Sequence, residues 1–312
     1  MNYLRLTLFF PIITILACAL AISPPSVAGL GQFSDRMVIL NVRVTDDTGR
    51  AVRDVSQAAF QVTEDGVPQK IELFIDDQIP LRYGLMIDSS GSLRDQFKEV
   101  MRTSVRILNS NTPQDETFLI RFISSDKIET VEELTSDKAR LLKALEAYYI
   151  EGGQTAVIDA VYLGVDYLVK MKTDGQHYRR QALVIVTDGE DRNSYYKKEQ
   201  LFDALSSADI QIFTIGFTKN LHGDKREKAV TLLSQLATDT GGRAFFPSST
   251  LELERIANEI INDIRTQYVV GYVPVGVDSK KDFHKIVVSI ADNPNQQKRI
   301  AVTRVGYSSK SK

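Results

Sequence analysis

The sequence predicts an α/β protein with a doubly wound, mostly parallel sheet covered by helices on both faces. Residues 81–87 and 182–187 are short, continuous apolar runs, which are typical of strands buried on both sides. Around them, strand-like and helix-like segments alternate as far as residue 265. This alternation is the pattern of successive βα units, so a parallel sheet between two helical layers is expected.

The elements of this central part follow in order along the chain. The expected strands are residues 81–87, 118–123, 182–187, 210–217 and 244–246. The expected helices are residues 93–108, 137–149, 156–169, 197–208, 225–239 and 251–265. The last of these helices has an apolar stripe at helical spacing, formed by Leu253, Ile256, Ile260 and Ile264, which predicts that one face is buried.

Short β-branched runs before and after the central part predict further strands. On the N-terminal side these are residues 37–44, 60–64 and 69–75, the last two forming a hairpin around Asp65-Gly66. On the C-terminal side they are residues 268–274, 284–290 and 300–305. The two flanks, residues 29–78 and 267–312, form either one small β domain around an inserted domain at 79–266, or two separate appendages. The sequence does not choose between these arrangements.

Residues 1–28 have the pattern of a secretory signal peptide. Arg5 precedes an apolar run at residues 6–22, and Ser26-Val27-Ala28 places small residues before a cleavage site at Gly29. The mature chain is therefore expected to be exported, to the periplasm or outside the cell.

Two alternatives to a cleaved signal peptide fit the segment less well. An uncleaved membrane anchor would need about 20 apolar residues, and Pro11 interrupts a run that is shorter than this. A lipoprotein would be attached through Cys18, but the Leu16-Ala17 that precedes it fits a lipobox poorly. The signal peptide is the interpretation that these features favour.

Composition excludes several classes of protein. The chain has 312 residues, of which 43% are hydrophobic and 25% charged, and its net charge of −2 gives no sign of nucleic-acid binding. Cys18 is the only cysteine, so the mature chain would have no disulfide, thiol nucleophile or thiolate ligand. No later segment approaches 18 apolar residues, so no membrane span is expected in the mature chain.

The strand at residues 81–87 ends in Asp88-Ser89-Ser90-Gly91-Ser92, which offers one carboxylate and two hydroxyls at alternate positions. Side chains at the carboxyl end of a strand point to the usual ligand position of an open α/β sheet. Hard oxygen donors without nitrogen or sulfur suit Mg²⁺ or Ca²⁺ better than Zn²⁺. This segment therefore predicts a metal site.

Two later segments add polar groups at the same edge of the predicted sheet. Gly152-Gly153-Gln154-Thr155 places a third hydroxyl at the start of a helix, and Thr187-Asp188-Gly189 ends a second buried strand with a carboxylate. If both strands belong to one parallel sheet, Asp88 and Asp188 lie side by side. The alternative is that Ser90 and Ser92 only cap the following helix and that Asp188 only makes a turn.

The sequence Asp-x-Ser-x-Ser, Gly-x-Thr and Thr-Asp-Gly, in this order, resembles the metal-ion-dependent adhesion site of von Willebrand factor type A (VWA) domains. The resemblance implies that Ser90 and Ser92 bind Mg²⁺ directly, Thr155 directly or through water, and Asp88 and Asp188 largely through water. Mn²⁺ or Ca²⁺ are the alternative cations. The remaining position would take an Asp or Glu side chain of a protein partner. The resemblance also implies that ligation at Thr155 is coupled to movement of the last core helix.

A second resemblance covers nearly the whole mature chain. Residues 62–71 read Val-Thr-Glu-Asp-Gly-x-x-Gln-x-Ile, residues 267–274 read Gln-Tyr-Val-Val-Gly-Tyr-x-Pro, and residues 304–307 read Arg-x-Gly-Tyr. Around a VWA core, these segments resemble the exported bacterial "VWFA-related" proteins that are common in acidobacteria. This group is known mainly as a sequence pattern, so it implies little about function.

Enzyme motifs are sparse. His177, His222 and His284 are scattered along the chain, with no zinc-ligand spacing, and no Gly-x-Ser-x-Gly nucleophile motif occurs. We therefore expect an exported, non-catalytic module that binds a protein partner through a divalent cation. The alternatives are a metal-dependent hydrolase, for which only Glu190 or Asp191 offers a general base, and an envelope scaffold with a vestigial metal site.

Overall fold

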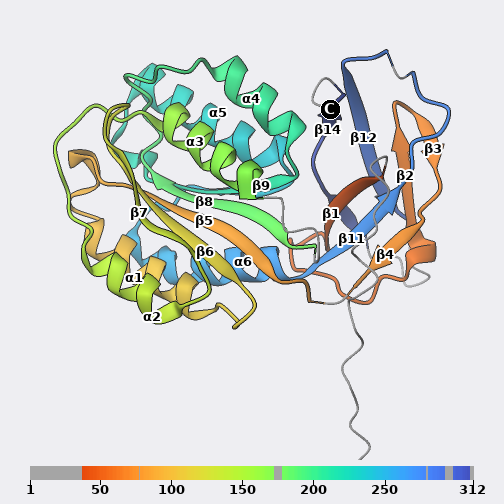
Figure 1. Cartoon of the computed structure of the whole chain (residues 1–312), viewed down its shortest axis with the longest axis horizontal. Coiled ribbons are helices and arrows are strands. Elements are labelled where there is room, and N and C mark those ends of the chain that lie inside the picture. Colours follow the sequence, from red (N-terminus) through yellow and green to blue (C-terminus); the bar gives the residue numbers. More distant parts are fainter. Residues whose placement is uncertain (1–36, 77, 172–177, 279, 292–297, 310–312) are drawn as a thin grey trace, which may run out of the picture.

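The computed structural model describes residues 37–76, 78–171, 178–278, 280–291 and 298–309, which form three β-sheets and two helical layers (Figure 1). The expected signal peptide, its cleavage site, Cys18 and His177 lie outside these residues. No helix in the described part of the chain is long and apolar enough to cross a membrane.

The central sheet has six strands in the order β10-β9-β8-β5-β6-β7. Their bounds are β5 Leu81–Asp88, β6 Glu116–Phe122, β7 Ile128–Thr135, β8 Arg180–Thr187, β9 Ile210–Gly216 and β10 Arg243–Phe245. All neighbours are parallel except β7, which runs antiparallel to β6. The predicted doubly wound, mostly parallel sheet is thus confirmed, while the half-exposed edge strand β7 was not expected from the sequence.

Helices cover both faces of this sheet, as expected. Their bounds are α1 Phe97–Asn109, α2 Lys138–Glu146, α3 Val157–Lys170, α4 Lys198–Ser207, α5 Gly223–Asp239 and α6 Leu253–Arg265. Helices α1, α2 and α6 pack on one face, and α3, α4 and α5 pack on the other (Figure 1). The buried stripe of the last helix is as predicted, because Leu253, Ile256, Ile260 and Ile264 all lie in the core.

Two helices begin later than the sequence suggested. The expected helix at 93–108 is a short 3₁₀ turn, Gly91–Leu93, followed by α1 from Phe97. The expected helix at 251–265 likewise starts with a 3₁₀ turn, Thr250–Glu252, before α6. Both 3₁₀ turns follow strands β5 and β10 at the carboxyl edge of the sheet, where the chain reverses direction before each helix.

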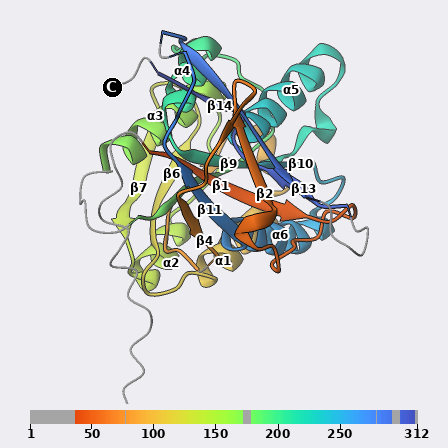
Figure 2. The ribbon, with the colours of Figure 1, turned by 90° about the vertical axis from the view of Figure 1, so that its right-hand side faces the viewer.

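The flanking segments pair with each other in two four-stranded sheets, with the orders β13-β1-β11-β4 and β14-β12-β2-β3. The strands are β1 Val38–Thr45, β2 Phe60–Glu64, β3 Val67–Gln69, β4 Leu73–Ile75, β11 Gln267–Tyr272, β12 Phe283–Ile290, β13 Ile300–Val302 and β14 Gly306–Ser308. Both sheets contribute to one apolar core, which includes Val42, Phe60 and Tyr268. Figure 2 shows β1, β2 and β11 in front of the central sheet.

The expected hairpin strand at residues 69–75 is wrong in part. The Asp65-Gly66 turn does join β2 to β3, but β3 ends at Gln69. The chain then crosses to the other small sheet, where β4 pairs with β11. An apolar run in the sequence cannot reveal this change of partner, because both halves of the run face the same core.

The small sheets lie at the amino ends of the central parallel strands (Figure 1). Arg180, the first residue of β8, is fully buried and donates from Nε to Oδ1 of Asn41 in β1 at 2.8 Å. Its other nitrogens donate to the carbonyl oxygens of Ile264 and Gln267, where α6 passes into β11. The carboxyl edge of the sheet therefore remains open on the opposite side.

Candidate metal centre

Strands β5 and β8 are neighbours, and this brings the two predicted aspartates to one place. Ile87 pairs with Val186 in the parallel register, so Asp88 lies beside Thr187 at the end of the strands. The Thr187 hydroxyl donates to Oδ2 of Asp88 at 2.7 Å. Asp188 is the first residue of the loop after β8, and its charge acts directly on Asp88.

The loop after β5 places the two serine hydroxyls together. The Ser90 N–H donates to Oδ1 of Asp88 at 2.9 Å, and the hydroxyls of Ser90 and Ser92 are 2.9 Å apart. Ser90 occupies the N-cap position of the 3₁₀ turn, but its side chain makes no capping hydrogen bond. Ser90 therefore does not cap this turn through its side chain, and its hydroxyl instead forms a hydrogen bond with that of Ser92.

Thr155 reaches the same edge from the loop before α3. A Cβ atom on Gly153 would lie 2.3 Å from Cγ2 of Ile123, so only glycine allows this loop to lie so close to β6. The carbonyl oxygen of Thr155 accepts from the N–H of Arg192 at 2.8 Å, which ties this loop to the one that follows Asp188. The Thr155 side chain is buried among these loops.

Asp188 also makes the turn that the alternative interpretation expected. Its Oδ1 accepts from the N–H of Glu190 at 3.0 Å, and Gly189 between them has a φ of 79°. A side chain at Gly189 would be strained, and its Cβ would lie 2.7 Å from Cδ1 of Leu233. The turn fixes the Asp188 carboxylate beside Asp88, so a turn role and a metal role are compatible.

The electrostatics of the site favour a cation. Burial, and then the charge of Asp188, raise the pKa of Asp88 to about 7 from an ordinary 3.8. Two carboxylates held together without a compensating charge resist ionisation, and a divalent cation between them would reverse this effect. The donor set of carboxylates and hydroxyls is one that fits Mg²⁺ or Ca²⁺.

Neighbouring charges limit which groups can act as a base. The carboxylate of Glu190 contacts both Arg192 and Lys225, and the bond to Arg192 is the main cause that lowers its pKa. Asp191 accepts from the N–H of Ile158 and from the hydroxyl of Ser194. Both carboxylates therefore already make contacts that stabilise the loop after β8.

Two features of the site were not expected from the sequence. Thr187 is part of the Thr-Asp-Gly motif, which gives it no role of its own, yet its hydroxyl links β8 to Asp88. Asp159 in α3 accepts from the backbone N–H groups of Tyr195 and Tyr196 and so supports the loop that begins at Asp188. No motif in the sequence marked Asp159, because its role depends on a contact across more than 30 residues.

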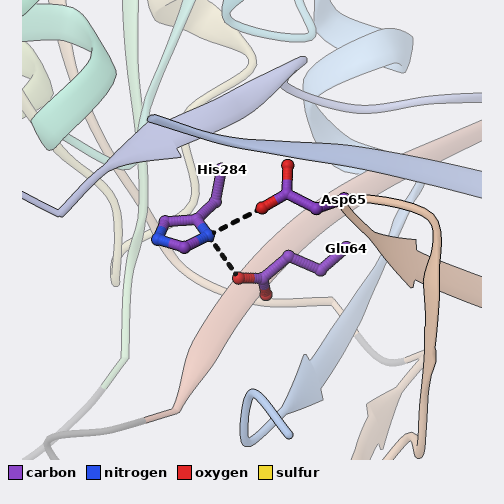
Figure 3. Close-up of side chains that lie close together, drawn as sticks. All are labelled: Glu64, Asp65 and His284. Carbon is purple, nitrogen blue, oxygen red and sulfur yellow. Dashed lines mark hydrogen bonds and ion pairs between the residues drawn. The ribbon is translucent and has the colours of Figure 1, made fainter. Parts of the chain in front are cut away.

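A second polar cluster lies in the small sheets, far from this edge. His284, which the sequence suggested to be an isolated strand-edge residue, is buried and has Nδ1 beside the carboxylates of Glu64 and Asp65 (Figure 3). Glu64 and Asp65 come from one segment of the second sequence resemblance, residues 62–71, and His284 pairs across the sheet with Tyr307 of another. The cluster was not expected from the sequence, because His284 is more than 200 residues away from the two carboxylates.

Comparisons with known proteins agree with this fold. The profile of the von Willebrand factor type A domain matches residues 84–259, more than half of the chain, so the protein belongs to the VWA family. VWA domains are commonly protein-interaction modules and often bind a divalent metal. A search of curated protein sequences gives no significant match.

Several solved structures are similar to the chain. An aerotolerance-related membrane protein from Bacteroides fragilis is 19% identical, with 58% of this chain and 98% of that chain covered and a TM-score of 0.45. BatB from Bacteroides thetaiotaomicron is 19% identical, covering 58% and 97%, with a TM-score of 0.44. A VWA protein from Catenulispora acidiphila is 9% identical, covering 89% and 76%, with a TM-score of 0.48.

Proposed function

We propose that this protein is an exported, metal-dependent binding module that holds an acidic side chain of a protein partner through Mg²⁺. In this proposal Ser90, Ser92 and Thr155 supply hydroxyl ligands, while Asp88 and Asp188 act largely through water. The observation that carries it is the pair of serine hydroxyls, 2.9 Å apart and free of capping bonds, beside a buried aspartate. Neutral ligands would leave the ion enough positive charge to attract a carboxylate.

The surface around the site supports a protein partner. Leu251, in the 3₁₀ turn that follows β10, is 90% exposed, and Tyr195 and Tyr149, in the loops before α4 and α3, are 83% and 53% exposed. Large apolar side chains that are this exposed are typical of interaction surfaces when they gather near one site. The edge thus combines a charged centre with apolar groups around it.

The hydrolase alternative has weaker support. A general base needs a carboxylate or imidazole that is free to accept a proton near the ion. Glu190 is neutralised by Arg192 and Lys225, and Asp191 accepts two hydrogen bonds within its loop. His222 is exposed at the start of α5, on the same edge, and is the residue to replace in a test of hydrolysis.

Binding of the metal is tested by thermal unfolding of the chain from residue 29, with Mg²⁺, Mn²⁺ or Ca²⁺ against EDTA. The melting temperature should rise with the preferred cation in the wild type and should not rise in Asp88→Ala. If the two proteins respond alike, the metal site is not the one proposed, and the scaffold alternative gains support.

Partner chemistry is tested with a phage-displayed random peptide library, selected on the immobilised chain in Mg²⁺ and eluted with EDTA. Eluted peptides should contain an Asp or Glu whose amide variant no longer binds, and they should not bind the Asp88→Ala chain. Peptides that elute without any acidic requirement would contradict the proposed mode of recognition.

We further propose that the flanking segments, residues 29–78 and 267–312, form one β domain, with the VWA domain at 79–266 inserted into it. Strand β1 pairs with β11 and β2 with β12, so each small sheet contains strands from both flanks. Limited proteolysis that releases one flank while the other stays folded would contradict this division.

A further inference from the structure

The buried cluster of Glu64, Asp65 and His284 lies between the ends of strands in one small sheet. Glu64 ends β2, Asp65 begins the turn to β3, and His284 lies in β12, whose neighbours are β2 and β14 (Figure 3). The side chains of Glu64 and His284 are 0% and 3% exposed. Charged and ionisable groups buried to this degree need a compensating partner.

The three side chains converge on one point. Nδ1 of His284 lies 2.9 Å from Oδ2 of Asp65 and 3.1 Å from Oε1 of Glu64. We propose that these three residues form a second metal site, which binds a transition-metal ion of the Zn²⁺ class rather than Mg²⁺. A donor set of one imidazole and two carboxylates suits Zn²⁺, whereas Mg²⁺ prefers oxygen ligands only.

The carboxylate oxygens that face away from the imidazole are held by other groups of the protein. Oε2 of Glu64 accepts from the hydroxyl of Tyr272 at 2.8 Å. Oδ1 of Asp65 accepts from the N–H of Lys285 at 3.0 Å and from the Lys281 ammonium group. Hydrogen bonds that orient ligating carboxylates in this way are a regular feature of protein metal sites.

Tyr307 also contacts the cluster. Its hydroxyl lies 2.8 Å from Oε1 of Glu64, and its ring stacks on the His284 imidazole with centroids 5.1 Å apart. Bonds of about 2.0–2.2 Å in a tetrahedral site place ligand atoms roughly 3.3–3.6 Å from each other. The observed separations are a few tenths of an ångström shorter, so a small opening of the cluster would accommodate the ion.

A proton on Nδ1 would make the same contacts with the two carboxylates, so the ion and the proton compete for one position. A ligating histidine nitrogen carries no proton, so the ion would take the place of this hydrogen-bond donor. Binding that depends on His284 as well as on Asp65 therefore separates this cluster from loose association of Zn²⁺ with surface carboxylates.

The experiment is a calorimetric titration of the metal-free chain, from residue 29, with Zn²⁺ in excess Mg²⁺. We expect one equivalent of Zn²⁺ to bind. Asp65→Asn and His284→Gln should each weaken binding by at least about tenfold. Asp65→Asn is the gentler change, because asparagine also tolerates the left-handed φ of 51° at this turn.

Two variants serve as matched controls. His222→Gln removes an exposed histidine, and Asp88→Ala removes a ligand of the candidate Mg²⁺ centre, so both should bind Zn²⁺ as the wild type does. Far-UV circular dichroism establishes that each variant is folded before its affinity is compared. The proposal is overturned if the wild type binds Zn²⁺ no more tightly than folded Asp65→Asn and His284→Gln.

Discussion

The hydroxyl of Thr187 donates a 2.7 Å hydrogen bond to Oδ2 of Asp88, joining the ends of the two central strands of the sheet. Both residues are completely buried, so the bond is shielded from water. The same hydroxyl accepts from the N–H of Gly189 at 3.0 Å. The Thr187 side chain therefore links the end of β5, at Asp88, to the loop after β8 that contains Asp188.

Thr187→Val should destabilise the metal-free protein by about 1–3 kcal/mol, because valine has the same shape but leaves a buried acceptor unpaired. It should also weaken Mg²⁺ binding, since Asp88 loses a group that holds its carboxylate in place. Urea denaturation in EDTA measures the first effect. Thr214→Val is the matched control, as Thr214 is equally buried in β9 but makes only a 3.5 Å bond. Equal effects of the two substitutions would contradict a special role for Thr187.

The raised pKa of Asp88 predicts how stability depends on pH. Its carboxyl has a pKa of about 7 in the folded, metal-free protein against an ordinary 3.8, so the folded state binds the proton more tightly than the unfolded state. This contribution to stability is fully present below about pH 4 and is lost as the pH rises through about 7. A tenfold difference in proton affinity between the two states corresponds to about 1.4 kcal/mol, so the loss is a few kcal/mol in total.

Asp88→Asn isolates this contribution. In EDTA, the variant should be more stable than the wild type at pH 8, and the difference should be much smaller at pH 5. Chemical denaturation at pH 5 and pH 8 in EDTA, and at pH 8 with Mg²⁺, measures the difference in unfolding free energy between the two proteins. A stability difference that does not change with pH would show that Asp88 ionises normally.

The loop that carries Thr155 depends on a close backbone approach. Gly153→Ala would place a Cβ 2.3 Å from Cγ2 of Ile123, so the loop must move and Mg²⁺ affinity should fall by about tenfold or more. At Gly152 an added Cβ has no heavy atom within 4 Å, so Gly152→Ala should leave affinity nearly unchanged. Calorimetric titration with Mg²⁺ compares the two, and equal affinities would argue against Thr155 as a ligand.

Arg180 links the central sheet to the flanking strands. Burial lowers the pKa of its guanidinium to about 10, and its hydrogen bonds go to Asn41 and to two backbone carbonyls. Arg180→Leu should cost about 2–4 kcal/mol of unfolding free energy, because it leaves these buried acceptors unpaired. Arg179→Leu, at the more exposed neighbouring position, should cost far less. Similar losses of unfolding free energy in the two variants would mean that the buried contacts of Arg180 contribute little to stability.

Much of the fold around the candidate metal centre was predictable because it depends on local sequence patterns. The runs at β5 and β8 are continuous and apolar, and polar residues follow at once, so strand, end and loop could be located separately. The edge strand β7 was missed because it is half exposed and carries several glutamates, which gives it no apolar pattern. The start of α1 was misplaced because Leu93 packs in the core from a 3₁₀ turn instead of from a helix.

The sequence by itself determined the alternation of strands and helices in the central part, apart from β7, the class of the sheet and the set of oxygen donors at its carboxyl edge. These features follow from periodicity and from the rule that parallel βα units end at one edge. Only the tertiary structure decided that β4 leaves the hairpin for another sheet, and that Thr187 is bonded to Asp88. It alone brought His284 to Asp65, 219 residues away. Pairing between distant segments depends on the whole core, so no local pattern specifies it.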